Sequence, residues 1–521
     1  MKRIASLLLG LAMAAAALSG CGAQGRETAA QEFPDAVSIV LSDDGIIVDG
    51  KAVSTDESAA VHTAHDIVCY ESGRDFTYGE GTEADEHTAE EAEAHTVVHI
   101  TQPGTYALSG TLSAGQIAVD LGEDAEDDPA AVVTLILNGV DITCTVAPAV
   151  IFYNVYECGS TDEDTASETV DTSAAGANVL IADGTINNVT GSYVARIYDP
   201  DSVVLSEDGM TVEDSEKLHK YDGAFYSKMS MNVDGGEAGT GVLNITADNE
   251  GLDTELHLTI NGGTINITSG NDGINTNEDG VSVTTINGGA LSIQVTGETG
   301  EGDGIDSNGY LVINGGTVTA AACSQSADAG LDADKGILIN GGTVTASGNM
   351  LDNIETGGQN YAVFSFTSRQ SGGTYRLKDS SGGTVLEWTP TNDFTSLLVS
   401  SPELAPGEYT LWCGEVQLAG SAGQGDGHPD GRPGGAEDGD IPEPSDNGVE
   451  APPENAGTER PEFSQRPEQA GEEVPAGERP QRPGNGELSE PLDGERASKR
   501  SEVFTIQEGA SFFQSIAPLA E

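Results

Sequence analysis

The sequence is poor in basic residues, aromatic residues and cysteine. Of its 521 residues, 86 are Asp or Glu and only 21 are Lys or Arg, so the formal net charge is −65. A protein this negative repels nucleic acid, which we therefore exclude as a partner. Aromatic residues make up only 5% of the chain, whereas glycine occupies 68 positions, a balance that fits a β-solenoid.

Helix-length apolar periodicity is also missing from the stretch around which the chain is organised, Gly251 to Gly358. Runs such as Thr264-Ile-Asn-Ile-Thr alternate β-branched apolar and polar residues, which predicts strands. Between the strands the phrase Ile-Asn-Gly-Gly recurs at spacings of 26, 27 and 26 residues, beginning at Ile260, Ile286, Ile313 and Ile339. A fixed period of this size indicates a solenoid, in which each coil buries its apolar face against its neighbours. We therefore predict an all-β, right-handed parallel β-helix with equivalent residues stacked about 4.8 Å apart.

The asparagines of this phrase suit a structural role, either in turns with positive φ or as an amide ladder between coils. They are Asn261, Asn287, Asn314 and Asn340.

A second phrase, Gly-Ile-Asp-Ser-Asn and its variants, interleaves with the first. Alternation places Ile305 and Ser307 inward and Asp306 and Asn308 outward. Across the coils this predicts two parallel rows of oxygen-bearing side chains on one face. The first row is Asp253, Asn275, Asp306, Asp332 and Asp352, and the second is Glu255, Asn277, Asn308 and Asp334, which ends in Ile354.

Stacked carboxylates at this spacing repel by roughly 1 kcal/mol per pair in water and more beside an apolar wall. Lys335 is the only Lys or Arg between Lys228 and Arg369, so side-chain pairing cannot neutralise the rows. Calcium accepts six to eight oxygen ligands from carboxylates, amides and carbonyls. We therefore predict bound Ca²⁺ on these rows, with further ligands from Asp272 and Asp303 just before the glycines. The alternative is a solvated acidic face.

Several segments resemble a family of bacterial carbohydrate-binding-domain proteins. They are Gly104-Thr-Tyr-Ala-Leu-Ser-Gly-Thr-Leu, Leu137-Asn-Gly-Val-Asp-Ile-Thr, Asp222-Gly-Ala-Phe-Tyr-Ser-Lys and the repeated Ile-Asn-Gly-Gly-Thr. The resemblance covers residues 37 to about 415. It implies a pectate-lyase-like β-helix with bound calcium, affinity for cellulose and polygalacturonate, and no established catalysis.

The amino terminus predicts secretion and lipid anchoring. Lys2 and Arg3 precede an apolar run too short to span a membrane. Leu18-Ser-Gly-Cys21 resembles a bacterial lipobox, which implies a lipid on Cys21 and display on the outer face of a bacterial cell membrane. The remaining five cysteines are odd in number, so they form no complete disulfide framework, although Cys144 and Cys158 could pair or stay as isolated thiols.

The rest of the chain divides by composition. Strand-like runs at sandwich spacing follow Gly358 and predict a small β module, while residues 421–500 hold 12 of the 21 prolines and predict disorder. The predicted segments are a signal peptide (1–20), a linker (21–36), the β-helix (37–358), the β module (359–415), an acidic Pro/Gly-rich tail (416–500) and an apolar end of unknown placement (501–521).

Three functions are compatible with these features. The first is a calcium-dependent, non-catalytic protein that binds cellulose or a polyuronate. The second is a polysaccharide lyase, which needs a positioned base as well as calcium. The third is a structural adhesin stabilised by calcium. Candidate sugar-contacting residues are Tyr221, Tyr226, Lys228 and Lys335, although core or loop packing explains the tyrosines equally well.

Overall fold

The computed structural model describes residues 32–423 and 500–518. The signal peptide, Cys21 and most of the predicted tail lie outside these residues. Within them nearly all regular secondary structure is strand, with one short helix, α1 (Ala89–Glu93), and two 3₁₀ turns, η1 (Glu123–Asp127) and η2 (Glu163–Thr165). No helix of residues 32–423 and 500–518 is long and apolar enough to cross a membrane.

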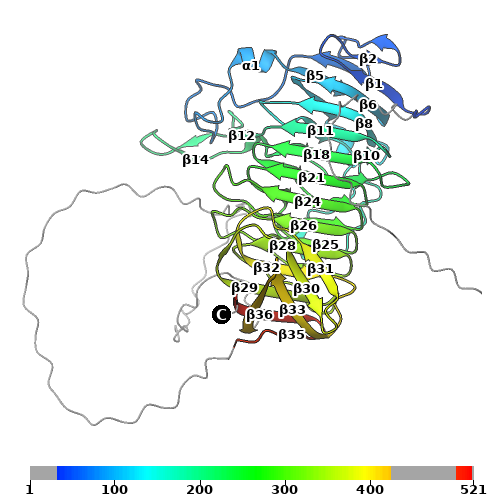
Figure 1. Ribbon diagram of the computed structural model, residues 1–521. Helices are drawn as coiled ribbons and strands as arrows, with labels where there is room; N and C mark the ends of the chain where they lie inside the picture. Colours follow the sequence, from blue (N-terminus) through cyan, green and yellow to red (C-terminus); the bar gives the residue numbers. More distant parts are fainter. Residues whose placement is uncertain (1–31, 424–499, 519–521) are drawn as a thin grey trace, which may run out of the picture. The chain divides into compact units, whose positions relative to one another are not determined.

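Parallel strands from successive coils stack in three ladders (Figure 1). The first ladder comprises the leading parts of β6 (Gly104–Leu112) and β8 (Val133–Thr143), then β10 (Ala177–Ile181), β17 (Met231–Asp234), β20 (Leu258–Ile260), β23 (Val283–Ile286), β25 (Tyr310–Ile313) and β27 (Gly336–Ile339). The second comprises the trailing parts of β6 and β8, then β11 (Ile186–Gly191), β18 (Val242–Ala247), β21 (Thr264–Ser269), β24 (Ala290–Val295), β26 (Thr317–Ala321) and β28 (Thr343–Gly348). The third comprises β5 (Thr96–Ile100), β7 (Gly115–Asp120), β9 (Val150–Asn154), β16 (Gly223–Ser227), β19 (Glu250–Thr254) and β22 (Ile274–Thr276).

The sequence period sets the register of these ladders. Ile260, Ile286, Ile313 and Ile339 pair directly in the first ladder, each buried and one coil apart. Alternation puts their neighbours outward, so the coil interiors fill with stacked aliphatic side chains. The second glycine of each turn has a positive φ, such as 86° at Gly289, and a Cβ there would lie 2.6 Å from the carbonyl oxygen of Gly263. The turn phrase therefore needs glycine at this position.

Short elements surround the first coils. β1 (Val37–Leu41) pairs in parallel with β6. β2 (Ile47–Val48) pairs antiparallel with β1, and β3 (Lys51–Ala52) pairs antiparallel with β2. β4 (Val61–Ala64) pairs antiparallel with β5. Two inserted hairpins lie between β11 and β16, formed by β12 (Val194–Tyr198) with β15 (Lys217–Tyr221) and by β13 (Val204–Leu205) with β14 (Val212–Asp214).

The carboxy-terminal strands form a second core in which many of the scarce aromatic residues gather. Phe364 stacks on Phe513 with ring centroids 5.2 Å apart, and Tyr375 stacks on Trp388 at 5.8 Å. The strands are β29 (Tyr361–Gln370), β30 (Tyr375–Asp379), β31 (Thr384–Trp388), β32 (Phe394–Ser400), β33 (Gly407–Cys413), β34 (Val416–Ala422), β35 (Phe504–Ile506) and β36 (Ala510–Pro518).

This module differs from the sequence prediction at its ends. β34 lies beyond the boundary predicted at residue 415 and pairs with β36. β36 also pairs in parallel with β29, so the apolar end that the sequence left unplaced completes the module. Apolar residues such as Phe504 and Ile516 supply the reason, because each is at most 2% exposed in this core.

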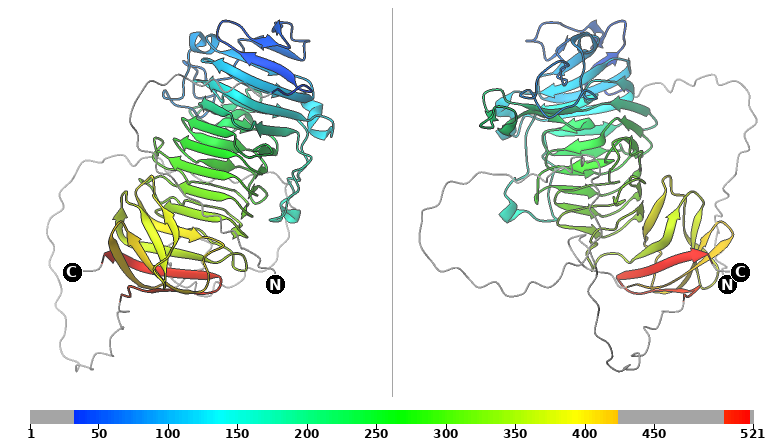
Figure 2. Two further views of the ribbon diagram at one scale, coloured as in Figure 1. Left: turned by 45° about the vertical axis from the view of Figure 1, so that its right-hand side comes forward. Right: turned by 90° about the vertical axis from the view of Figure 1, so that its left-hand side faces the viewer.

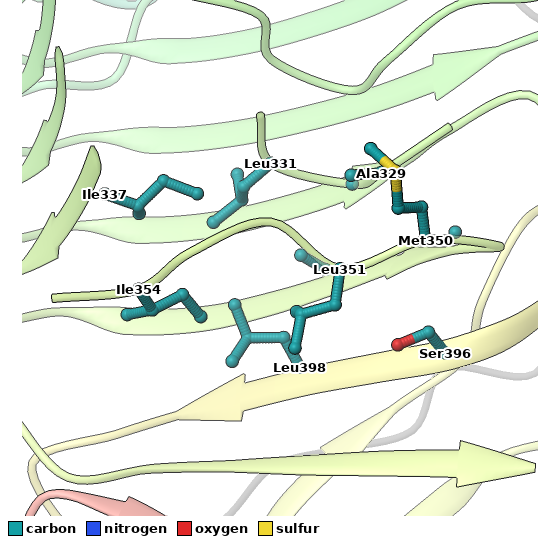
Figure 3. Close-up of a pocket in the computed structure, with 11 residues that line it drawn as sticks. Ala329, Leu331, Ile337, Met350, Leu351, Ile354, Ser396 and Leu398 are labelled. Carbon is teal, nitrogen blue, oxygen red and sulfur yellow. The ribbon is translucent and has the colours of Figure 1, made fainter. Parts of the chain in front are cut away.

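The module also closes the end of the solenoid. β32 pairs antiparallel with β28, which would otherwise present an unpaired strand edge. Leu331 and Ile337 of the last full coil face Leu398 across a gap of only about 10 Å³ (Figure 3). Ile354, predicted to point outward, is only 6% exposed and lines the same gap. That prediction is wrong because the last copy of the phrase turns its apolar side chain under the cap.

All five cysteines of the described residues are free, namely Cys69, Cys144, Cys158, Cys323 and Cys413. Cys144 and Cys158 therefore do not pair.

Candidate functional site

The predicted rows of polar side chains do stack along the third ladder. Tyr226 pairs with Asp253, which pairs with Asn275. Backbone hydrogen bonds of 2.8 Å from Asp306 to the Ile274 carbonyl and from Asp332 to the Ile305 carbonyl continue the row. The inward prediction is also confirmed, since Ile305 and Ser307 are 0% exposed.

The second row follows two residues later on each coil. The amides of Glu255, Asn277, Asn308 and Asp334 each bond a carbonyl of the previous coil at distances of 3.0, 3.0, 2.9 and 3.1 Å. Asp352 belongs to the irregular last copy, where its Oδ2 accepts from the Ala333 amide at 3.0 Å. Only Asp352 and Ile354 therefore leave the predicted register.

A third row lies at the position before each glycine. The Asp303 amide donates to Asp272 Oδ1 at 2.6 Å, and the Ala329 amide donates to Asp303 Oδ1 at 2.6 Å. Glu250 holds the same position one coil earlier, because Leu252 pairs with Ile274. Asp272 and Asp303 thus accept from the backbone of the next coil, whereas Glu250 accepts from the Asn275 side chain.

The centre of this surface is buried, which argues against the alternative of a solvated acidic face at these residues. Asp253 is 0% exposed, Glu250 5% and Asp272 8%. Burial raises the pKa of each of these carboxyls well above its ordinary value, and neighbouring carboxylates raise it further. Burial likewise raises the pKa of Asp303.

Three oxygens in this buried group have no hydrogen-bond donor. They are Glu250 Oε2, Asp253 Oδ2 and Asn275 Oδ1. Their companion atoms are satisfied: Asn275 Nδ2 donates to Glu250 Oε1 at 3.1 Å, and Asn277 Nδ2 donates to Asp253 Oδ1 at 2.6 Å. Buried acceptors without donors are costly, so this group calls for protons or a cation. We call Glu250, Asp253, Asp272, Asn275 and Asn277 the acidic cluster.

One lysine approaches this cluster from the inserted hairpin. Lys220 Nζ lies 3.0 Å from Asp222 Oδ2. Asp222 raises the pKa of Lys220, so the ammonium stays charged, while burial raises the pKa of Asp222. A single ammonium cannot balance the several carboxyls around it.

Glu255 at the cluster edge is held by two other groups. Lys217 Nζ lies 3.0 Å from its Oε1, and the Tyr226 hydroxyl donates to the same oxygen at 2.6 Å. Tyr226 is 2% exposed and Tyr221 7%, and their rings pack 5.0 Å apart. This geometry favours the packing alternative for both tyrosines over sugar stacking.

The two predicted sugar-binding lysines are not members of the acidic cluster. Lys228 is exposed on the row that contains Glu255. Lys335 Nζ bonds Glu163 Oε1 at 2.9 Å, where Glu163 belongs to the insertion between β9 and β10.

Sequence reasoning missed Glu250, Asp222 and Lys220. The signal for Glu250 was available, because it precedes Gly251 just as Asp272 precedes Gly273. Lys220 carried no such signal, since β15 belongs to an insertion outside the repeat, whereas Asp222 opens the quoted segment Asp222-Gly-Ala-Phe-Tyr-Ser-Lys.

The donor set is compatible with a hard cation. Within residues 32–423 and 500–518, no three His, Cys, Asp or Glu side chains suffice by themselves to hold a metal ion. Calcium, however, also takes amide and backbone carbonyl oxygens, and the donor-free Asn275 Oδ1 lies in the cluster. The three oxygens without donors are acceptors, as the ligands of Ca²⁺ are, and protons on the two carboxyls are the other means of satisfying this group.

Stacked parallel strands with a buried acidic cluster define a β-structured protein with a candidate cation site. A sequence profile of carbohydrate-binding domain-containing proteins matches residues 94–381, more than half of the 521 residues. The chain therefore belongs to this family, as the sequence resemblance suggested.

Two further comparisons place the chain beside clostridial proteins. A carbohydrate-binding domain-containing protein of Acetivibrio thermocellus is 28% identical over 167 residues, which cover 32% of this chain and 43% of that relative. The match thus spans less than half of the relative's length. The solved gadolinium derivative of a polysaccharide lyase-like protein from C. thermocellum is 21% identical, with a TM-score of 0.31, and the match covers 59% of this chain and 92% of that one. A TM-score this low leaves the fold to be defined by the strand register described above.

Proposed function

We propose that this chain is a calcium-dependent, non-catalytic polysaccharide-binding protein whose stacked coils form a right-handed β-helix. Membership of the carbohydrate-binding family supports a polysaccharide as the ligand. The observation that carries the calcium requirement is the set of donor-free oxygens on Glu250, Asp253 and Asn275.

Glu250, Asp253 and Asn275 would hold the ion, with Asp272 and Asn277 beside them. Asp303, Asp306, Asn308, Asp332 and Asp334 continue the rows toward the cap and are candidates for further ions. Bound calcium would supply positive charge that a uronate carboxylate can share, which explains how a chain of net charge −65 could bind an acidic glycan. Cellulose and polygalacturonate are the proposed glycans.

Of the lysines near the rows, Lys220 and Lys335 argue against the lyase alternative, whereas Lys228 is exposed. A lysine abstracts a proton only when its amine is unprotonated and near the substrate. Asp222 keeps Lys220 protonated, and Lys335 is paired with Glu163. The third alternative, an adhesin, would bind calcium without binding glycan.

Display on the cell surface through a lipid on Cys21 is part of the same proposal. The support is the lipobox-like Leu18-Ser-Gly-Cys21 that follows a short apolar run.

Calorimetric titration of the chelator-treated full chain tests these functions together. We expect calcium to bind, oligogalacturonate to bind only after calcium, and no unsaturated product to absorb in the near ultraviolet. Glycan binding that persists in excess chelator would overturn the calcium requirement. An ultraviolet-absorbing product would establish the lyase, and calcium binding without any glycan response would establish the adhesin.

A further inference from the structure

A groove of about 780 Å³ runs along the outer surface of the first ladder, on a different sheet from the acidic cluster. One wall is part of the insertion of residues 157–175, which we call the strap. Figure 2 shows the strap, with η2 in blue-green, running beside the stacked coils.

Two rows of side chains from successive coils form the floor. Thr259, Thr285, Val312 and Leu338 pair in register along the first row. The second row is the asparagine ladder, in which Asn287 donates to Asn261, Asn314 to Asn287 and Asn340 to Asn314, each at 2.9 Å. An amide ladder was one of the structural roles predicted for these asparagines.

The asparagine ladder leaves hydrogen-bonding capacity unused. An amide has two N–H donors and two carbonyl lone pairs, and the ladder occupies one of each in an inner member such as Asn287 or Asn314. All four asparagines are exposed. The groove therefore presents a donor and an acceptor at every coil, next to the methyl groups of Thr285, Val312 and Leu338.

That pattern matches the surface of a sugar chain. A pyranose ring carries hydroxyl groups at its edge and C–H groups on its faces, so it needs polar partners beside an apolar strip. Coils stack about 4.8 Å apart, which is near the length of one sugar unit in an extended chain. One unit per coil would therefore stay in step with the ladder.

The strap is fixed to the coils at both ends and in the middle. Glu157 Oε1 and Oε2 accept from the Ser230 hydroxyl at 2.8 Å and its amide at 2.6 Å. Glu163 pairs with Lys335 at 2.9 Å. On the return, the Thr172 hydroxyl lies 2.7 Å from both Asn232 Oδ1 and Thr259 Oγ1. The wall is thus part of the folded structure.

The charges around the groove select against acidic glycans. Glu168, Asp171 and Asp234 line it, and no Lys or Arg is among its described lining residues. A polyuronate would meet like charge here, whereas a neutral glycan would not.

We propose that this groove binds an extended, neutral polysaccharide, with Asn287 and Asn314 bonding its hydroxyls and the Thr285–Leu338 row contacting its C–H faces. The proposal rests on the polysaccharide-binding function and assigns its neutral ligand to a site separate from the acidic cluster.

The test uses the full chain in calcium, with cellohexaose as the extended neutral probe, maltohexaose as a curved neutral probe and oligogalacturonate as an acidic probe. Thr285→Arg places a long side chain in the groove. Ser292→Arg makes the same change on an exposed position of the same coil in the second ladder. We expect cellohexaose affinity to fall on the order of tenfold or more in T285R and to stay unchanged in S292R.

A second pair of variants separates glycan contact from ladder stability. The second ladder has its own amide ladder, in which Asn266 donates to Asn244 and Asn244 to Asn188, each at 2.9 Å. The double variant N287A/N314A should lose cellohexaose binding. The double variant N244A/N266A, which also removes two stacked amides, should keep it.

The outcomes also distinguish the groove from the general function. Unchanged cellohexaose binding in T285R and N287A/N314A would overturn the groove while leaving polysaccharide binding intact. If the protein bound oligogalacturonate but neither neutral probe, the proposal of a neutral ligand would be wrong while polysaccharide binding would stand. If maltohexaose bound as tightly as cellohexaose, the proposed preference for an extended chain would be wrong. A wild-type chain that binds none of the three probes would overturn both proposals.

Discussion

Replacing Glu250 with Gln should stabilise the calcium-free protein at neutral pH and remove part of its response to calcium. Glu250 is 5% exposed, its Oε2 has no donor, and burial together with Asp253 raises its pKa. Ionising it in the folded state without a cation is therefore costly. A neutral amide removes that charge, and its N–H₂ group brings donors to a cluster that lacks them.

The sign of the pH dependence follows from the raised pKa. The folded state holds the Glu250 proton more tightly than the unfolded state, so this contribution to stability is complete below roughly pH 4, the ordinary carboxyl pKa. It is lost as the pH rises toward the folded-state pKa. While Glu250 is protonated only in the folded state, it contributes a loss of about 1.4 kcal/mol per pH unit. Saturating calcium should oppose this loss because it favours the ionised carboxylate.

Thermal unfolding followed by circular dichroism, from pH 4 to 8 in chelator and in calcium, measures this effect. Many exposed carboxyls, such as Asp183, have a pKa lowered by hydrogen bonds and change stability in the opposite direction. The difference between wild type and E250Q isolates Glu250 because those carboxyls are common to both. Glu298→Gln, on an exposed turn, is the matched control. An E250Q variant with the wild-type pH slope in chelator, or with the full wild-type calcium response, would refute the reasoning.

Other predictions concern the strap, the cap and the thiols. Lys335→Ala should lower thermal stability by less than about 1 kcal/mol because its pair with Glu163 is exposed, yet it should weaken cellohexaose binding; unchanged binding in calorimetry would mean that the strap does not need this pair. Leu398→Ala should cost about 2–5 kcal/mol in chemical unfolding because it opens a cavity under the last coil, and a loss below 1 kcal/mol would show that the cap is loosely packed. Alkylation after unfolding without reductant should modify all five cysteines from Cys69 to Cys413, and any protected pair seen by mass spectrometry would contradict the free thiols.

The sequence predicted the strand register and the polar rows, which the repeat determines. The spacing of Ile260, Ile286 and Ile313 set the register of the first ladder, and the Asp253–Asn275 row followed from the interleaved phrase. A repeated phrase constrains each residue through identical neighbours above and below, so local pattern and final position agree.

The sequence could not predict the positions of the insertions. Nothing local to Glu163 indicates that it pairs with Lys335, which lies 172 residues away. The approach of Lys217 and Lys220 to the third ladder likewise depends on a hairpin outside the repeat. For this reason the sequence predicted only that Asp253 points outward from its coil and did not predict its burial, whereas Asp253 is 0% exposed. Ile354 was misplaced for a related reason, since the partner that buries it comes from the cap.

One repeat period produces two surfaces of different chemistry because the outward side chains of each ladder come from different positions of the repeat. At the first ladder the outward position is Asn, whose amides hydrogen-bond one another and need no counterion. At the third ladder many of the corresponding residues are Asp or Glu, and Glu250 and Asp253 each have an oxygen without a hydrogen-bond donor. A neutral ladder therefore needs no counterion and keeps donors for a neutral ligand, whereas the acidic ladder needs either protons or a cation to offset its buried carboxyls. If both proposals hold, chelator should abolish acidic-glycan binding while leaving cellohexaose in the groove, provided that the coils stay folded.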